Sequence, residues 1–324
     1  MALLRSAVRS RYAPFLTYEL YPMPSLLKKI LKTLQIPLIL IAIFAIQHFC
    51  HTQTAGFSIA KITAKHPFNP KWETAPLTQA ETERLDPILA QKFTFFKHGG
   101  QSYVFLSEDG KTVLKVFKHH HMRVPTWFKK LPLPAKWKRF HHKFIKNKEL
   151  KLPAFFKSCT LAYNNFQQRT GLIYLHLNQT AHLKKKLILI DKLNISHALD
   201  LDTLDFAIQE RTELPHDHFL RLRKENNLAS AKESIDSLLN LIAERCQKGI
   251  FDRDPCIRRN CGFIGNRAVD IDLGSYIEKK SVKLPFITQA ELYYKTLKFQ
   301  QWLKKKYPEA SRYFDAELQQ RLKG

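Results

Sequence analysis

The sequence predicts an α+β protein that begins with a small antiparallel sheet and ends with a mostly helical part. Three observations lead to this prediction. Residues 93–118 hold three strand-forming runs separated by a Gly-Gly pair and an Asp-Gly turn, which is typical of consecutive hairpins. Residues 230–248 repeat apolar side chains every three to four positions, as an amphipathic helix does. Hydrophobic residues make up 44% of the 324 residues, enough for a sizeable core.

The N-terminal segment 1–55 is predicted to be basic and to contain one apolar helix. Its basic residues are Arg5, Arg9, Arg11, Lys28, Lys29 and Lys32. The strictly apolar run 36–46 is short for a membrane span, and the wider stretch 31–49 reaches spanning length only if polar residues are included. A membrane anchor, a signal sequence that starts at Met1 or Met23, and a buried helix are the alternatives.

Residues 56–92 are expected to be a linker with one short helix over 79–90, because prolines recur through them. The folded domain is then expected over 93–324, with a first lobe at 93–192 and a second at 193–324. Within the first lobe, Asp109-Gly110 joins strands 102–106 and 112–117. Strands at 171–178 and 187–192 would complete a sheet of five, and 191–205 would cross to the second lobe.

Residues 119–157 form an insertion that is rich in Lys, Arg and aromatic residues and has a single acid, Glu149. This composition is typical of surfaces that meet anionic lipid, glycan or nucleic acid. A solvated helix with a few packed aromatic side chains is the alternative. His119, His120 and His121 are consecutive, so their side chains point apart and do not predict a metal site.

Whole-chain composition points the same way. The formal net charge of +25 favours anionic partners. The five cysteines include no C-x-x-C pair, which argues against a zinc site, and their odd number argues against a complete disulfide framework.

The second lobe is expected to contain helices at 218–226, 230–248, 292–307 and 308–322. Between them, residues 249–274 are predicted to form a strand, a turn at Gly265-Asn266 and a second strand, with a positive φ at both turn residues. This hairpin would gather polar side chains at one edge of the fold: Asp252, Asp254, Asn260 and Asp272. Such a group suits Mg²⁺ on a polyphosphate and a proton acceptor for a hydroxyl. Asp270 is a further candidate ligand, or the true one if the register shifts by two.

The order of these residues resembles the catalytic segment of the protein kinase-like superfamily. Asp252-Arg253-Asp254 stands in the place of His-Arg-Asp, and Asp272-Leu273-Gly274 in the place of D-F-G. Asn260 stands one residue later than the metal-binding Asn of that family. The resemblance covers residues 93–276. The short chain after Gly274 lacks A-P-E, so it looks more like small-molecule and lipopolysaccharide-core kinases of bacteria than like Ser/Thr kinases.

The resemblance implies a bilobal fold with ATP between the lobes. It implies that Gly99, Gly100 and Ser102 cover the phosphates and that Lys115 orients the α- and β-phosphates. It also calls for a Glu on the helix at 154–169, which has none; the expected position falls near Lys157 or Ser158.

The same resemblance gives roles to three residues of the second lobe. Asp254 would accept the proton of the attacking hydroxyl, and Asn260 and Asp272 would hold Mg²⁺. The function implied is phosphoryl transfer from ATP to a hydroxyl of a glycan, lipid or small molecule, with protein substrates less favoured.

Two other functions are compatible with the sequence. The missing Glu, the reduced glycine turn and the apolar N-terminal helix suit a membrane-attached pseudokinase that binds without turnover. A basic peripheral protein that binds nucleic acid through 119–157 is less favoured. A membrane-associated or exported protein is expected, but its side stays open: the charge bias puts the domain outside, where ATP is scarce.

Overall fold

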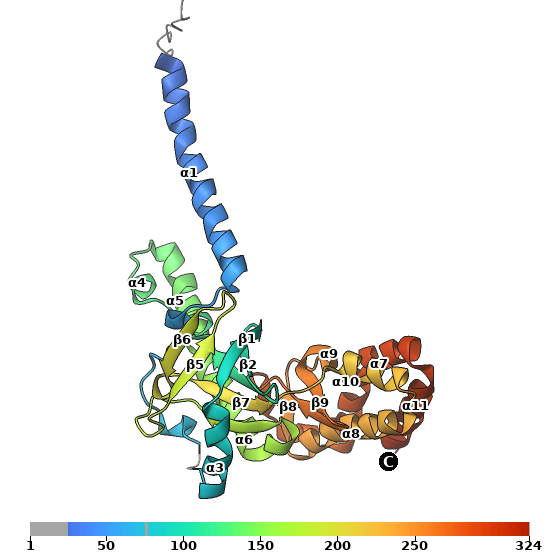
Figure 1. Ribbon diagram of the computed structural model, residues 1–324. Coiled ribbons are helices and arrows are strands. Elements are labelled where there is room, and N and C mark those ends of the chain that lie inside the picture. Colours follow the sequence, from blue (N-terminus) through green and yellow to red (C-terminus); the bar gives the residue numbers. More distant parts are fainter. Residues whose placement is uncertain (1–24, 75–76, 324) are drawn as a thin grey trace, which may run out of the picture. The chain divides into compact units, whose positions relative to one another are not determined.

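The computed structural model describes residues 25–74 and 77–323 (Figure 1). Three of the basic N-terminal residues, Arg5, Arg9 and Arg11, and the alternative start Met23 lie outside them. The chain divides into two compact units, residues 1–52 and 53–324. The α+β class is confirmed, with a sheet followed by a helical C-terminal part.

The apolar N-terminal segment is helical, as expected. Helix α1 (Ser25–Thr54) includes Pro37. Its 22-residue stretch Thr33–Thr54 is long and apolar enough to cross a membrane, by length and composition only, and none of its side chains is buried. A signal sequence would satisfy the same criteria.

The larger unit is built on a mixed sheet of seven strands in the order β4-β7-β3-β2-β1-β5-β6. Neighbouring strands are antiparallel except β1 and β5, which are parallel. The strands are β1 (Lys92–His98), β2 (Ser102–Ser107), β3 (Thr112–Phe117), β4 (Leu172–His176), β5 (Lys186–Ile190), β6 (Ser196–Asp200) and β7 (Phe206–Glu210).

The expectation of five antiparallel strands with a crossing segment at 191–205 was wrong in two respects. Asn194 has a positive φ of 62° and turns the chain back, so that β6 pairs with β5 and lengthens the sheet. The apolar run of β7 then inserts between β3 and β4. The crossing to the helical part therefore follows β7, at residues 211–214.

Residues 56–92, expected as a linker, contain packed structure. They form α2 (Ile59–Ile62), α3 (Gln79–Leu89) and a short 3₁₀ turn, and α3 starts with a capping box between Thr78 and Glu81. Side chains from this segment, including Ile62 and Leu85, share one core cluster with the sheet.

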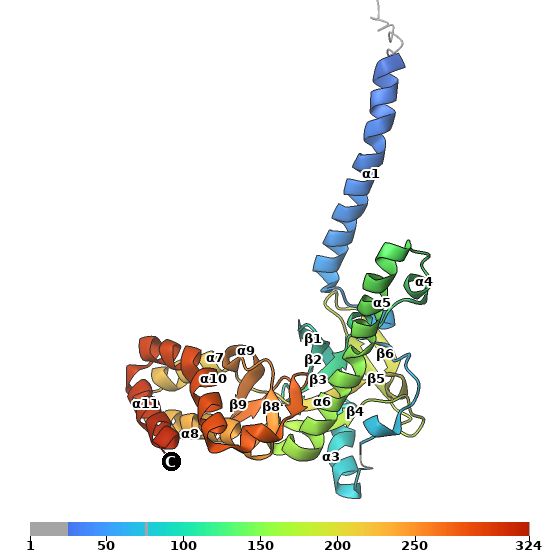
Figure 2. The same ribbon diagram turned by 180° about the vertical axis from the view of Figure 1, so that it is seen from behind.

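The remaining helices are α4 (Thr126–Lys129), α5 (Ala135–Glu149), α6 (Lys151–Phe166), α7 (Pro215–Lys224), α8 (Leu228–Gln247), α9 (Ile257–Asn260), α10 (Pro285–Lys306) and α11 (Pro308–Lys323). Short 3₁₀ turns occur at Pro70–Trp72, His119–His121, Gln167–Arg169, Leu201–Thr203 and Lys280–Lys283. Helix α6 packs beside β4, and helices α7 to α11 group together beyond the sheet in both views (Figures 1 and 2).

Two small hairpin-like ribbons lie where the second part meets the sheet. β8 (Ile250–Asp252) pairs with β11 (Tyr276–Glu278), and β9 (Cys261–Ile264) pairs with β10 (Arg267–Asp270). Helix α8 packs against β10 and buries Ile235, Leu238 and Leu239 completely. The acidic segment is thereby held on a rigid helix.

Candidate functional site

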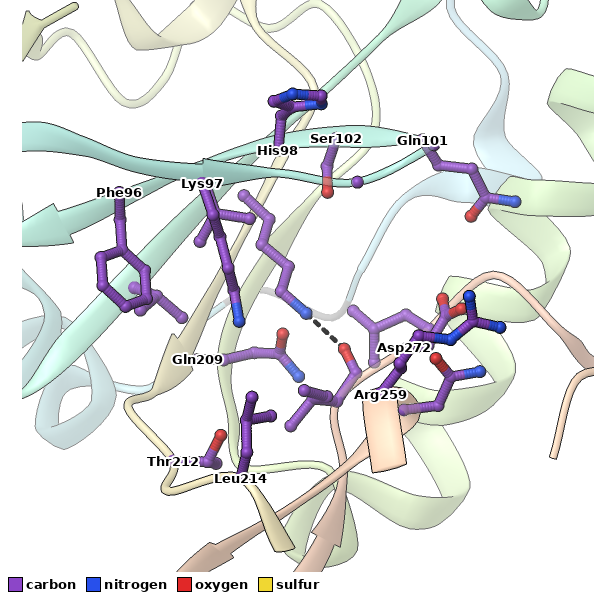
Figure 3. A pocket seen from close by; sticks show the side chains of 18 of the residues that line it. Phe96, Lys97, His98, Gln101, Ser102, Gln209, Thr212, Leu214, Arg259 and Asp272 are labelled. Atoms are coloured by element: carbon purple, nitrogen blue, oxygen red, sulfur yellow. Dashed lines mark hydrogen bonds between the residues drawn. The ribbon is translucent and has the colours of Figure 1, made fainter. Parts of the chain in front are cut away.

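A cavity of about 620 Å³ lies between the sheet and the β9–β10 ribbon. It is lined by all seven residues that the sequence singled out: Gly99, Gly100, Ser102, Lys115, Asp254, Asn260 and Asp272. Figure 3 shows Gln101 and Ser102 on the sheet side and Asp272 and Arg259 opposite them. The fold therefore brings together two motifs more than 130 residues apart along the chain.

The glycine turn between β1 and β2 leaves open space above its backbone. A Cβ atom added to Gly99 or Gly100 would meet no atom within 4 Å. The Gly99 N–H donates to the Ser102 carbonyl at 2.9 Å, and the Gly99 carbonyl accepts from Lys118 Nζ at 2.7 Å. Burial lowers the pKa of Lys118 to about 8. Lys118 also lies 4.2 Å from the Tyr103 ring, so it fixes the turn from beneath.

Lys115 extends from β3 to the segment that carries Asp272. Its Nζ donates to the carbonyl of Ile271. Burial lowers the pKa of Lys115 to about 8, and the neighbouring Asp272 carboxylate acts in the opposite direction. Burial makes the charge of the Lys115 ammonium costly in the empty cavity. An anion bound beside Lys115 would offset this cost.

The helix expected to supply a glutamate supplies a hydroxyl in its place. Ser158 of α6 is buried, donates from Oγ to the Leu273 carbonyl at 2.6 Å and accepts the Tyr276 N–H at 2.7 Å. Its neighbour Lys157 is exposed and lies 3.2 Å from Glu278. Helix α6 is thus attached to the backbone on both sides of Gly274, with no ion pair to Lys115.

Replacing Ser158 by alanine tests this attachment. Ser158→Ala leaves the buried Leu273 carbonyl and Tyr276 N–H without their partner, so we expect a loss of about 1–3 kcal/mol in the free energy of unfolding. Urea denaturation measures it. Ser237→Ala is a comparison, since Ser237 Oγ also accepts a backbone N–H, from Ala268, but at a half-buried site. Equal losses in both variants would contradict a special role for Ser158.

The turn of the acidic hairpin differs from the prediction. Gly265 has a φ of 58°, but Asn266 does not have a positive φ. One positive φ at the first central position is the pattern of a type II′ turn. The Asn266 side chain explains the choice, because its Nδ2 donates to Glu233 on α8 at 2.7 Å.

Two of the acids gathered by this hairpin are structural. Asp252 and Asp270 are buried, and Arg245 of α8 lies between them, with Nη1 2.7 Å from Asp270 Oδ2 and 3.5 Å from Asp252 Oδ2. Asp270 also accepts from Tyr276 at 2.7 Å. The alternative that made Asp270 a metal ligand is therefore wrong, because its carboxylate is enclosed by donors away from the cavity.

The side chain of Asp252 positions the neighbouring acid. It accepts the Asp254 N–H at 3.0 Å and the Ser275 hydroxyl at 2.6 Å. Asp254 itself is exposed at the cavity. In Asp252-Arg253-Asp254, Asp252 is therefore the buried support and Asp254 is the accessible carboxylate.

Two oxygen-bearing side chains of the cavity, Asn260 and Asp272, form the candidate cation site. Asn260 Nδ2 donates to the Asp254 carbonyl at 2.6 Å, which leaves Asn260 Oδ1 for a cation. Asp272 Oδ1 accepts the Gly274 N–H at 3.0 Å, which fixes the carboxylate. Within the described residues, no group of three or more His, Cys, Asp and Glu side chains could hold a metal ion. An Asp-Asn pair fits Mg²⁺ that is bound largely through phosphates, as Mg²⁺ commonly is.

Several residues that line the cavity were not predicted from the sequence. Gln101 lies against Gly274, where an added Cβ would be 1.9 Å from its Oε1 and 2.8 Å from Phe155 Cε2, so a larger residue there would displace both side chains. Arg258 and Arg259 directly precede Asn260, and Gln209 and Thr212 come from the end of β7 and the crossing segment. Recognising β7 as a strand would have pointed to the last two.

Comparisons with known proteins find distant likenesses among solved structures only. No protein-family model matches the chain, and no curated protein matches it. Among solved structures, the crystal structure of WbdD at 2.2 Å is similar, with 13% sequence identity and a TM-score of 0.31. The match covers 68% of this chain and 44% of that one, so the chain spans less than half of the matched structure.

Proposed function

We propose that the protein is an ATP-dependent phosphotransferase that acts on a hydroxyl group of a glycan, a lipid or a small molecule. The observation that supports this most is the cavity in which the glycine turn, Lys115, Asp254, Asn260 and Asp272 meet. The resemblance to the kinase-like superfamily predicted these residues separately along the chain, and their meeting at one cavity supports the proposal.

Each group has a stated task in this proposal. The turn at Gly99 and Gly100 covers the phosphates, because neither residue has a side chain and the space beside each Cα is open. Lys115 pairs with the α- and β-phosphates, and Asp254 accepts the proton of the attacking hydroxyl. Asn260 and Asp272 would hold Mg²⁺, whose charge neutralises the transferred phosphoryl group when bound. The acceptor approaches from the exposed side of Asp254.

A pseudokinase is the second candidate, and one observation favours it. Lys115 Nζ donates to the Ile271 carbonyl, and α6 offers no carboxylate to draw it away. The Ile271 carbonyl therefore competes with the phosphates for the Lys115 ammonium. In that case nucleotide binds without transfer.

Mg²⁺-dependent ATP binding by the full chain in detergent tests the proposed cleft. We expect both Lys115→Ala and Asp272→Asn to weaken binding by at least about tenfold, because each removes a charged contact. Lys186→Ala and Asp217→Asn, exposed lysine and aspartate substitutions elsewhere, should bind as the unchanged protein does. No binding by the unchanged protein would refute both candidates. Binding without phosphate release would favour the pseudokinase.

The depressed pKa of Lys115 predicts a pH dependence. Its ammonium is charged below a pKa of about 8 and becomes neutral as the pH rises through that value. ATP affinity should therefore be full below pH 8 and decline above it. Lys115→Arg should remove the decline, because arginine stays charged. Lys118 has a similar pKa, so Lys118→Arg is the comparison; if it alone removes the decline, the assignment to Lys115 fails.

A further inference from the structure

Residues 126–149 form a projecting arm, composed of α4 and α5, that stands out from the sheet and the C-terminal helices in both views (Figures 1 and 2). Neither helix has a buried residue. A 15-residue helix that buries nothing gains little from the core, so its surface needs another explanation.

The arm nevertheless has a defined internal structure. The Phe128 ring of α4 lies 4.8 Å from the His141 ring and 5.5 Å from the Phe144 ring of α5. His141 Nε2 is 2.8 Å from the Phe128 carbonyl, and Lys129 lies 2.5 Å from Glu149. These contacts hold α4 against α5. The side chains on the outer surface of the arm take no part in them.

Those outer side chains are large and apolar. Trp137, Phe140 and Phe144 are spaced by three and four residues along α5, and Phe144 is still 44% exposed although its ring also meets Phe128. Trp127 and Phe140 are each 68% exposed and Trp137 is 54% exposed. Leu131, in the loop between α4 and α5, and Leu150, directly after α5, are exposed as well. Such a row of aromatic and aliphatic side chains in water is unfavourable unless a partner covers it.

The charge of the arm is almost entirely positive. Its basic residues are Lys129, Lys130, Lys136, Lys138, Arg139, Lys143, Lys146 and Lys148. Its one acid, Glu149, is paired with Lys129 inside the arm. The partner must therefore offer both negative charge and an apolar layer.

We propose that this arm docks on the surface of an anionic phospholipid bilayer, with its aromatic row in the headgroup region and its lysines on the lipid phosphates. Amphipathic helices rich in Lys and Arg with Trp and Phe on the other face bind membranes in this way. The chain supplies a reason for a bilayer to be close, since α1 has the length and composition of a span and the folded unit begins at residue 53. This inference does not depend on catalysis in the cavity.

A nucleic acid would meet the positive charge but not the aliphatic side chains. Bases stack on aromatic rings, whereas Leu131 and Leu150 offer no ring. The lipid partner accounts for both kinds of exposed residue, and nucleic acid is kept as an outcome of the test.

Tryptophan fluorescence of the full chain in nanodiscs with anionic, acyl-brominated phospholipid tests the docking. Bromine quenches a tryptophan that enters the lipid. Trp127→Phe/Trp137→Phe keeps Trp72, which packs 5.0 Å from Phe156, and Trp302, which stacks 4.0 Å from His216. We expect quenching of the unchanged protein and its loss in the double variant. Equal quenching of the two proteins would overturn the proposal.

Charge reversal provides a second test of the docking. Lys136→Glu and Lys143→Glu should each lower the ratio of docked to undocked arm by at least about fivefold, since loss of a lysine at an anionic surface alone costs on the order of 1 kcal/mol and the new carboxylate is repelled. Thermal unfolding should not change, because α5 has no buried side chain. Lys304→Glu makes an equal charge change at an exposed position of α10 and should leave the quenching unchanged.

Two results would refute docking by the arm. One is an equal loss of quenching in the α5 and α10 variants, which would indicate general charge attraction. The other is tight, steeply salt-dependent binding of a single-stranded oligonucleotide by the lysines of α5 without any lipid quenching, which would assign the arm to nucleic acid.

Discussion

Replacing Arg245 by alanine is expected to lower the free energy of unfolding by about 3–5 kcal/mol, the cost of leaving buried charges without their partner. Arg245 is 2% exposed and serves both Asp252 and Asp270. Burial lowers its pKa, but the two carboxylates raise it above the ordinary value, so the guanidinium stays charged. Without it, two carboxylates would face each other in the core.

Arg169→Ala is the matched control for this prediction. Arg169 pairs with Glu244, one residue before Arg245, but both partners are partly exposed. An exposed ion pair contributes at most about 1 kcal/mol. Urea denaturation of both variants measures the difference. Losses of similar size would show that burial of Asp252 and Asp270 does not govern the stability of the acidic segment.

The second large effect is expected from Asp254→Asn. A positioned proton acceptor contributes on the order of 10²–10⁴ to a rate, so ATP turnover should fall by that factor. Nucleotide affinity should be unchanged, because the contact of Asp254 with its neighbour Asp252 is made by the backbone N–H and survives the substitution. Hydrolysis of γ-labelled ATP, with water as the acceptor, measures the rate without knowledge of the substrate.

The contrast with Asp272→Asn makes this prediction specific. Asp272→Asn should lose nucleotide affinity and turnover together, whereas Asp254→Asn should lose turnover alone. Hydrolysis by Asp254→Asn at the rate of the unchanged protein would remove Asp254 as proton acceptor. Absence of hydrolysis in the unchanged protein, with ATP bound, would leave the pseudokinase as the function.

The parts of the fold that the sequence predicted are those determined locally. Strands β1 to β3 follow from turn residues, and Gly110 indeed has a φ of 70°. Helix α8 follows from its apolar spacing. The site motifs were found because each is short and ordered along the chain, and Lys115 stands out as a charge within an apolar strand.

What the sequence did not predict depends on distant partners. Asp270 and Asp272 have the same spacing and charge, and only the position of Arg245 on another helix separates the buried acid from the cavity acid. Ser158 is an ordinary helix residue until Leu273 and Tyr276 meet it. Strand β6 was missed because its pattern is short and polar. It is a strand because it pairs with β5.

The position of β7 has a consequence for the order of folding. β7 lies between β3 and β4, and β4 reaches the rest of the sheet only through it. During synthesis, β1, β2 and β3 emerge first and can pair locally, but β4 has no neighbour until residues 206–210 have left the ribosome. Pairings between distant segments form slowly. The nascent chain therefore holds the edge of β3 open from residue 117 until residue 206 has emerged, and during that interval the protein is exposed to aggregation and to chaperones.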